Sequence, residues 1–227
     1  MTHARQLLLA RLRRVAAALT PSGLLDDVML VGGSVPALYH LERVALRETA
    51  DVDLVVRATN ESTYQRQVRR FLQQGVHPDP QAEHRARFLL GEDALDIAST
   101  PYDGVGLNRW YEGAIDAAVR DLETGFRVVT PVWFLATKLE AWKDRGVQDP
   151  LLSTDLVDIV NVLVGLSGIW EELERDDESV RRFVRFELAV VARRPDALEI
   201  VQTCLRGDDA SQALAEPLLT RIRRLKR

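Results

Sequence analysis

Two aspartates separated by one residue are the part of this sequence most suited to chemistry. Asp51 and Asp53 begin an apolar stretch that runs to Val56. Because alternate residues of a strand share one face, both carboxylates project from the same surface. At about 4 Å, two like charges repel by roughly 4 kcal/mol at an effective dielectric constant of about 20. We expect a cation to offset this repulsion, and an oxygen-rich site with few histidines nearby favours Mg²⁺ or Mn²⁺ over Zn²⁺.

The turn Gly32-Gly33-Ser34 is a second candidate feature, and it follows a short apolar strand predicted over 28–31. Ser34 is predicted to cap a helix that runs to Leu41. Backbone N–H groups and the positive end of this helix would then meet at the turn. This arrangement is typical of a phosphate-binding corner.

A third carboxylate, Asp96, lies on a later predicted strand between Leu95 and Ile97. It comes beside Asp51 and Asp53 if the two strands are neighbours in the sheet. A phosphate-binding turn next to three carboxylates is suited to two-metal phosphoryl or nucleotidyl transfer.

The elements that must position these residues change in character after Thr130-Pro131. Before this point the pattern predicts strands and helices, with loops at 77–80 and 101–112 and a hairpin turn at 91–93. The predicted strands are 28–31, 51–57, 87–90, 94–99 and 126–129, and the predicted helices include 4–19 and a segment from about 60 to 75. After Pro131 only helical periodicity is found: 131–145, 153–165, 169–174, 177–193, 196–205 and 210–225. We therefore predict an α/β (α+β) domain with a short mixed sheet over 1–130 and a helical domain over 131–227.

Composition excludes several classes of protein. The chain of 227 residues has 46% hydrophobic and 28% charged residues, which indicates a folded protein with a sizeable core. A net charge of −4 argues against bulk attraction to polyanions. The single cysteine, Cys204, excludes an internal disulfide framework. No apolar run of about 18 residues and no signal-peptide pattern is found, so we expect a cytoplasmic protein without a membrane span.

The order of an apolar strand, Gly-Gly-Ser, a helix, Asp-x-Asp and a later strand aspartate resembles the nucleotidyltransferase superfamily related to DNA polymerase β. This resemblance covers residues 28–100. The downstream sequences at 133–146 (WFLATKLEAWKDRG) and 153–160 (STDLVDIV) resemble the AbiEii/AbiGii-type nucleotidyltransferase toxins and their relatives. Together the similar region spans roughly 28–165.

The resemblance implies roles for the residues in the first part of the chain. The turn containing Gly32, Gly33 and Ser34 would contact the terminal phosphates of a nucleotide. Asp51, Asp53 and Asp96 would ligate metal, and Asp96 would help to deprotonate the acceptor hydroxyl. Arg43 and Arg47, which precede the aspartate pair, are candidates for phosphate or acceptor contacts, or else belong to a solvated rim.

The resemblance also implies roles on the predicted helices that follow residue 130. Lys138 would reach the triphosphate, and Asp155 or Asp158 would orient that lysine or the nucleotide. Ordinary alternatives exist for each: Lys138 could pair with a nearby acidic residue on a helix surface, and the two aspartates could favour the positive end of their helix.

The resulting hypothesis is a Mg²⁺-dependent (or Mn²⁺-dependent) nucleotidyltransferase that moves a nucleoside monophosphate from an NTP to an acceptor hydroxyl. The toxin resemblance implies an acceptor on RNA, such as a tRNA 3′ end, or on a protein, together with a cognate antitoxin. One alternative is a nucleotidyltransferase that modifies small molecules such as antibiotics. The other is a nucleotide-binding module with inert carboxylates.

Overall fold

The computed structural model describes residues 3–42, 44–102 and 108–225, and it has a mixed α/β fold, which confirms the predicted class. The chain forms two compact units. The first consists of Met1–Leu38 and Arg47–Thr130, and the second of Tyr39–Leu46 and Pro131–Arg227. The segment Tyr39–Leu46 thus lies in the first half of the sequence but belongs to the second unit.

The first unit is built on a mixed sheet of seven strands in the described residues, in the order β3-β4-β5-β2-β1-β7-β6. The strands are β1 (Val28–Val31), β2 (Asp51–Val56), β3 (His77–Pro78), β4 (Arg87–Leu90), β5 (Asp93–Ser99), β6 (Val119–Arg120) and β7 (Arg127–Val128). Strand β2 runs antiparallel to β1 and parallel to β5, and β1 is parallel to β7. Neighbours β2 and β5 are thus far apart in sequence and lie side by side.

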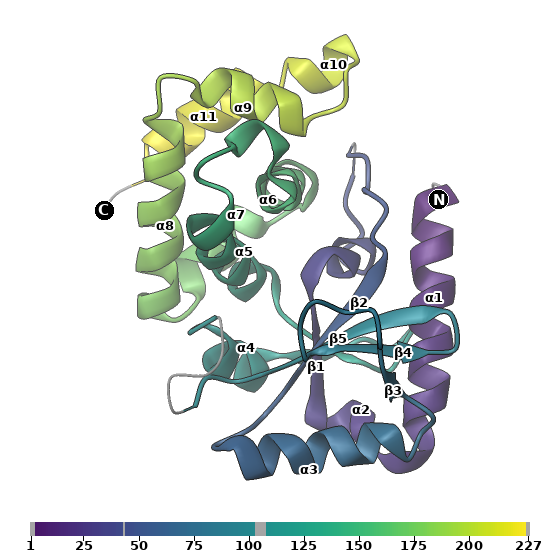
Figure 1. Ribbon diagram of the computed structural model, residues 1–227. Coiled ribbons are helices and arrows are strands. Elements are labelled where there is room, and N and C mark those ends of the chain that lie inside the picture. Colours follow the sequence, from purple (N-terminus) through teal and green to yellow (C-terminus); the bar gives the residue numbers. More distant parts are fainter. Residues whose placement is uncertain (1–2, 43, 103–107, 226–227) are drawn as a thin grey trace. The chain divides into compact units, whose positions relative to one another are not determined.

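Helices of the first unit supply apolar side chains to the core beside the sheet. They are α1 (His3–Leu19), η1 (Thr20–Ser22), α2 (Leu24–Asp27), α3 (Glu61–Leu72) and α4 (Tyr111–Ala117). Figure 1 shows α3, in blue, running beneath the strands. The Tyr64 hydroxyl of α3 donates a hydrogen bond of 2.8 Å to the Ile97 carbonyl of β5. Asn60 caps α3 by accepting a hydrogen bond from the Thr63 N–H, which explains where this helix begins.

The predicted helix after the glycine turn is wrong in length and type. The structure has a 3₁₀ helix, η2 (Gly32–Ala37), and Ser34 lies inside it instead of capping an α-helix. The Leu38 N–H bonds to the Val35 carbonyl, three residues back, as in a 3₁₀ turn. His40 then adopts a φ of 53°, through which no right-handed helix continues.

Other boundaries also differ from the prediction. The hairpin turn holds two residues, Gly91 and Glu92, because Leu90 pairs with Asp93. His77–Pro78, predicted as loop, is an edge strand, which is where proline is tolerated in a sheet. Helix α4 replaces part of the predicted 101–112 loop, of which 103–107 lie outside the described residues.

The second unit is helical from Pro131 onward. Its helices are α5 (Pro131–Arg145), η3 (Pro150–Leu152), α6 (Thr154–Gly165), α7 (Ile169–Arg175), α8 (Glu178–Ala192), α9 (Ala197–Cys204), α10 (Asp209–Gln212) and α11 (Ala215–Arg223). The predicted helix over 210–225 is divided in two. The interruption falls between Gln212 and Ala215, and Pro217 lies in the first turn of α11. Pro217 has no N–H to donate to the carbonyl of Ala213, four residues back, and a proline is tolerated in the first turn of a new helix.

The segment Tyr39–Leu46 packs against α6 within the second unit. The Glu42 N–H donates a hydrogen bond of 2.9 Å to the Gly165 carbonyl, and the Asn161 side-chain amide donates one of 3.1 Å to the Ala45 carbonyl. A Cβ on Gly165 would lie 3.0 Å from both the Glu42 carbonyl oxygen and Val44. Glycine at the end of α6 therefore permits this close approach.

Within the described parts of the chain, no helix combines the length and apolar character needed to cross a bilayer.

Candidate functional site

One row of residues crosses four strands of the first unit. Arg87 on β4 pairs with Asp96 on β5, Asp96 with Asp53 on β2, and Asp53 with Val31 at the end of β1. Gly32 directly follows Val31. The sheet therefore brings two of the predicted aspartates and the glycine turn into one line, although 64 positions separate Gly32 from Asp96 by number (96 − 32).

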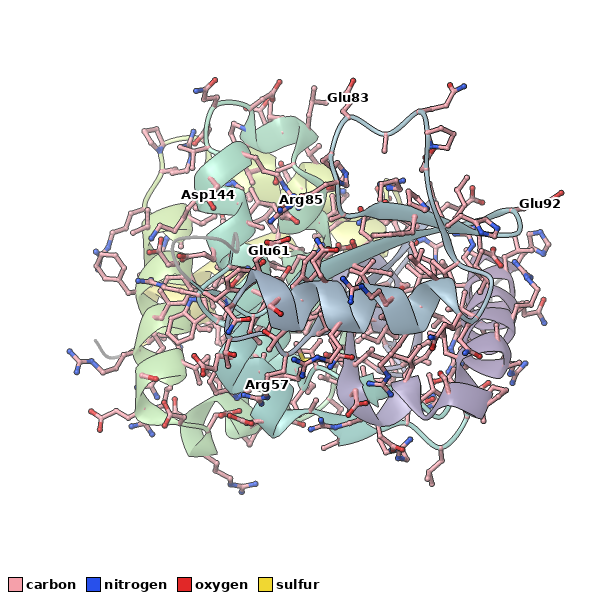
Figure 2. The ribbon with its side chains drawn as sticks, turned by 60° about the horizontal axis from the view of Figure 1, so that its bottom comes forward. Arg57, Glu61, Glu83, Arg85, Glu92 and Asp144 are labelled. Carbon is pink, nitrogen blue, oxygen red and sulfur yellow. The ribbon has the colours of Figure 1, made fainter. Side chains whose placement is uncertain are left out.

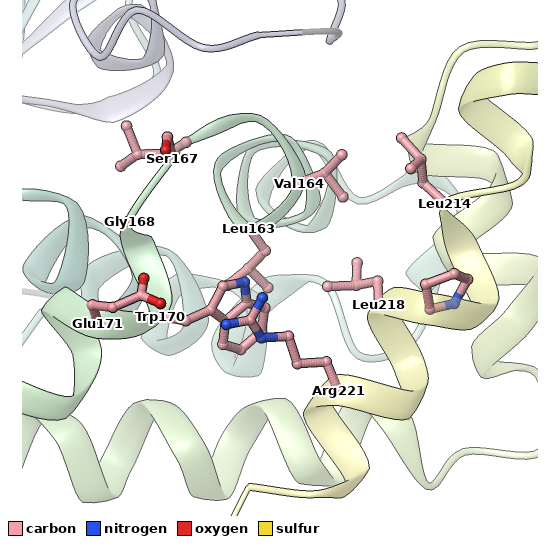
Figure 3. A pocket seen from close by; sticks show the side chains of 11 residues that line it. Leu163, Val164, Ser167, Gly168, Trp170, Glu171, Leu214, Leu218 and Arg221 are labelled. Atoms are coloured by element: carbon pink, nitrogen blue, oxygen red, sulfur yellow. The ribbon is translucent and has the colours of Figure 1, made fainter.

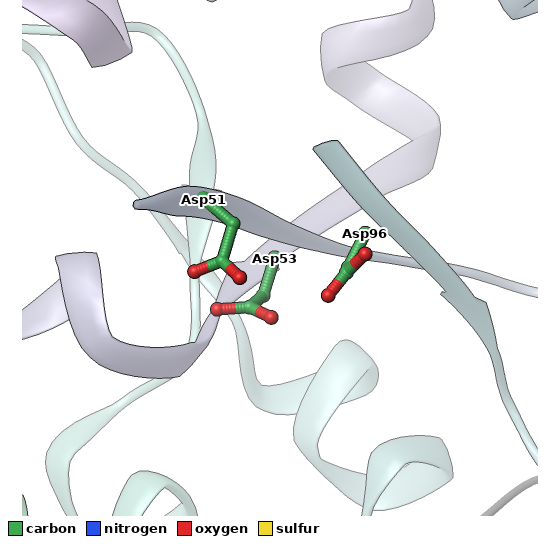
Figure 4. A group of neighbouring side chains, drawn as sticks. All are labelled: Asp51, Asp53 and Asp96. Atoms are coloured by element: carbon green, nitrogen blue, oxygen red, sulfur yellow. The ribbon is translucent and has the colours of Figure 1, made fainter. Parts of the chain in front are cut away.

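The three aspartates share the more exposed face of the sheet. Burial alternates along β5, where Leu95 and Ile97 are fully buried and Asp96 between them is half-buried. Asp51 and Asp53 likewise flank the buried Val52. Each aspartate offers a carboxylate oxygen such that the three atoms lie within 4.8 Å of one another, and Figure 4 shows the three side chains converging. Such a set of hard oxygen donors fits Mg²⁺ or Mn²⁺.

The positive charge next to these carboxylates comes from Arg87, which the sequence analysis did not single out. Its guanidinium binds Asp96 with two hydrogen bonds, Nε to Oδ1 at 2.5 Å and Nη2 to Oδ2 at 2.9 Å. Nη2 also donates a hydrogen bond of 3.0 Å to Oδ2 of Asp51. The hydrogen bond to Asp96 and the surrounding carboxylates raise the pKa of Arg87. The sequence signal that could have identified Arg87 is the register of the hairpin. With a two-residue turn at Gly91 and Glu92, Arg87 lies opposite Asp96.

The glycine turn approaches the aspartates closely. Gly32 has a φ of 75°, and a Cβ there would overlap the carboxylate of Asp53. A Cβ on Gly33 would overlap the guanidinium of Arg47 and the methyl group of Thr49. Glycine is thus required at both positions by sterics, and Arg47 brings a cation against the turn. Arg43, the other arginine of the predicted pair, lies outside the described residues.

Ser34 carries a buried polar atom that the protein does not satisfy. The residue is 1% exposed, and its Oγ finds no hydrogen-bond partner among the described residues. Burying an unpaired hydroxyl costs about 1–3 kcal/mol, so such an atom in a candidate site points to a ligand. Ser34 is two residues from Gly32, which touches Asp53.

Comparison with known proteins adds no family to these observations. No protein-family model matches the sequence, and no curated protein matches it significantly.

Lys138, Asp155 and Asp158 come together in the helical unit as a buried ionic cluster. Lys138 Nζ lies 3.1 Å from Oδ1 of Asp155 and 2.7 Å from Oδ2 of Asp158. Arg145 adds a bidentate contact to Asp155, with both hydrogen bonds at 2.9 Å. Burial opposes ionisation of Asp155, but the charge of Lys138 and the hydrogen bond from Arg145 outweigh it and lower the pKa. The alternative reading of Lys138, a pairing with a nearby acidic residue on the helix surface, is thus wrong, because its partners are two buried carboxylates on the next helix.

The helical unit also contains an open cavity of about 640 Å³ between α6, α7 and α11. Figure 3 shows Arg221 beside Trp170 in this cavity, and its guanidinium carbon lies 4.5 Å from the centroid of that ring. Its lining includes none of the predicted site residues. Cys204 is also in this unit, and burial raises the pKa of its thiol to about 12, so it is a poor nucleophile.

Proposed function

We propose that this chain is a metal-dependent nucleotidyltransferase whose first unit has a DNA polymerase β-like fold. The observation that carries the proposal is the row that aligns Asp96 and Asp53 with the glycine turn, with Asp51 on the same face. This arrangement places candidate metal ligands next to a candidate phosphate-binding corner. The unpaired Oγ of Ser34 supports the presence of a polar ligand at that corner.

In the proposed reaction, the acceptor oxygen forms a bond to the α-phosphorus of an NTP, and the bond between the α-phosphorus and the bridging oxygen breaks. Pyrophosphate leaves, and a carboxylate oxygen of Asp96 takes the acceptor proton. Asp51, Asp53 and Asp96 would hold Mg²⁺ or Mn²⁺, which supplies a counter-charge for the triphosphate when bound. Gly32, Gly33 and Ser34 would bind terminal phosphates through backbone N–H groups and the Ser34 hydroxyl.

The role of Lys138 in contacting the triphosphate stays a prediction. Its ammonium already has two carboxylate partners, so the cluster links α5 to α6. Asp155 and Asp158 are the two partners of this lysine, and the family resemblance implies that one or the other orients the lysine or the nucleotide. For the acceptor, we propose the hydroxyl of an RNA end or of a protein, in line with the toxin-like sequence of α5 and α6.

A labelling experiment tests this function. The full chain is incubated with Mg²⁺, total tRNA and each of the four NTPs, carrying label on either the α- or the γ-phosphate. Nucleotidyl transfer predicts that only the α-label reaches an acceptor and that pyrophosphate is released. Transfer of the γ-label would instead indicate a phosphotransferase.

The matched variants are Asp53→Asn in the triad and Asp144→Asn on the exposed side of α5 (Figure 2). Transfer should be lost in the first and kept in the second. Label transfer that survives Asp51→Ala combined with Asp53→Ala contradicts the assignment of these residues. A drug acceptor added to the same assay tests the small-molecule alternative, and calorimetry with ATP and Mg²⁺ tests the inert-module alternative.

A further inference from the structure

The guanidinium of Arg87 forms a two-pronged hydrogen-bonded contact, or fork, with the carboxylate of Asp96, and this contact uses the oxygens that a metal ion would need. A bidentate arginine takes one lone pair on each carboxylate oxygen, on the side that faces the donor. Arg87 does this to both oxygens of Asp96, and its Nη2 also holds Oδ2 of Asp51. Two of the three candidate ligands are thus already bound by a cation that stays protonated at any physiological pH.

From this geometry we propose that Arg87 is the internal counter-ion of the three aspartates and that it competes with a divalent cation for Asp51 and Asp96. The inference rests on the proposed function for the identity of the site as a metal centre. It assigns to Arg87 a positioning role. The guanidinium keeps the carboxylates together without metal and must release them before all three can ligate an ion.

Two arguments favour competition over simple support of the ligands. A guanidinium that contacts two of the ligands places a positive charge within a few ångströms of any ion they share, and at that range like charges repel strongly. In addition, the contacts of Arg87 are made to the carboxylate oxygens themselves. A residue that only orients a ligand leaves the metal-facing oxygen free.

The position of Arg87 in the sheet allows it to move. It begins β4, whose outer neighbour is the two-residue edge strand β3, and its side chain is 23% exposed. A rotation of this long side chain toward solvent breaks no backbone hydrogen bond. His84 Nε2 lies 3.9 Å from Oδ1 of Asp96, farther from this carboxylate than the guanidinium of Arg87, whose Nε is 2.5 Å away.

The test measures Mn²⁺ binding to the nucleotide-free protein by electron paramagnetic resonance, with no turnover required. Arg87→Gln should bind Mn²⁺ at least about tenfold more tightly than the natural chain, because a competing positive charge is removed. Arg85→Gln is the matched control. Arg85 lies two residues away and pairs with Glu61 at 3.4 Å, outside the triad (Figure 2). The Mn²⁺ affinity of Arg85→Gln should stay within about twofold of that of the natural chain, because exposed charges at longer range are screened.

A second readout is thermal stability in EDTA. The Arg87→Gln protein should melt at a lower temperature than the natural chain, since three carboxylates lose their counter-ion, and saturating Mn²⁺ should raise its melting temperature more than that of the natural chain. If Arg87→Gln does not fold, Arg87→Lys keeps the charge but cannot form the fork, and it should bind Mn²⁺ moderately more tightly.

Equal or weaker Mn²⁺ binding by both Arg87 variants overturns the proposal, because a supporting residue would give that result. The outcome is separable from that of the proposed function. Tighter Mn²⁺ binding by Arg87→Gln, without nucleotidyl transfer by the natural chain, would support Arg87 as the counter-ion and contradict the proposed enzymatic activity. Nucleotidyl transfer by the natural chain, with unchanged Mn²⁺ affinity in Arg87→Gln, would support the enzymatic activity and contradict the role of Arg87 as a competing counter-ion.

Discussion

The Nζ atom of Lys138 lies 2.7 Å from Oδ2 of Asp158, and neither side chain is more than 8% exposed. Asp155 completes the arrangement from one turn earlier on α6, and Arg145 covers it from the end of α5. Two positive and two negative groups thus balance one another in the helical unit, where Lys138 and both aspartates are buried and the Arg145 side chain reaches the surface. A balanced buried cluster contributes little net stability, but losing one member leaves an uncompensated charge.

Lys138→Met should therefore lower the free energy of unfolding by about 3–5 kcal/mol, because the buried carboxylates of Asp155 and Asp158 would both lose the ammonium charge that faces them. Urea denaturation measures this change. The double variant Lys138→Met/Asp158→Asn should be less destabilised than the sum of its two single variants, since it removes one charge of each sign. An unchanged urea midpoint for Lys138→Met would show that the ion pair is unimportant for folding.

Asp155 should make stability depend on pH in the acid range. Its pKa is lowered in the folded protein from an ordinary value of 3.8. The stabilisation is therefore fully present above about pH 4 and is lost as pH falls through the lower folded value. The difference in urea midpoint between the natural chain and Asp155→Asn should shrink as pH falls below 3.8. Asp144→Asn, an exposed change on α5 (Figure 2), should show no such trend.

Gly32→Ala should damage the site beyond its cost in backbone strain. Gly23 is a matched control because it has a similar φ of 68°, against 75° for Gly32, with no atom within 4 Å of a Cβ. Both alanine variants should lose about 1–2 kcal/mol from the left-handed conformation. Only Gly32→Ala displaces the Asp53 carboxylate, so only this variant should lose Mn²⁺ binding. Equal Mn²⁺ affinity in the two variants would contradict the prediction and show that the glycine turn does not affect the metal site.

Ser34→Ala should separate stability from ligand binding. The Ser34 Oγ is buried without a hydrogen-bond partner in the described chain, so removing it should leave the free energy of unfolding unchanged or raise it by up to about 2 kcal/mol. Calorimetry with a non-hydrolysable NTP should show weaker binding by the same variant. A clear loss of stability without ligand would mean that the hydroxyl serves the fold.

Several local features could be read from the sequence. The strand Val28–Val31 and the helix Pro131–Arg145 match their predicted bounds, because each has a continuous apolar pattern and a clear end signal. Strand alternation alone places Asp51 and Asp53 on one face. The predicted α-helix after Gly33 was wrong, because the chain forms a 3₁₀ helix there and His40 adopts a positive φ, and the local apolar pattern indicates neither.

The sequence by itself determined which residues are acidic, which faces are apolar and where the strands change to helices, since these depend on neighbours a few positions apart. Only the tertiary structure decided that β5 pairs with β2, so that Asp96 meets Asp53, and that Arg87 lies against the carboxylates of Asp96 and Asp51. It also gave Lys138 two buried carboxylate partners in place of the surface pairing. Strand order and side-chain partners depend on contacts between distant parts of the chain, and local periodicity carries no information about them.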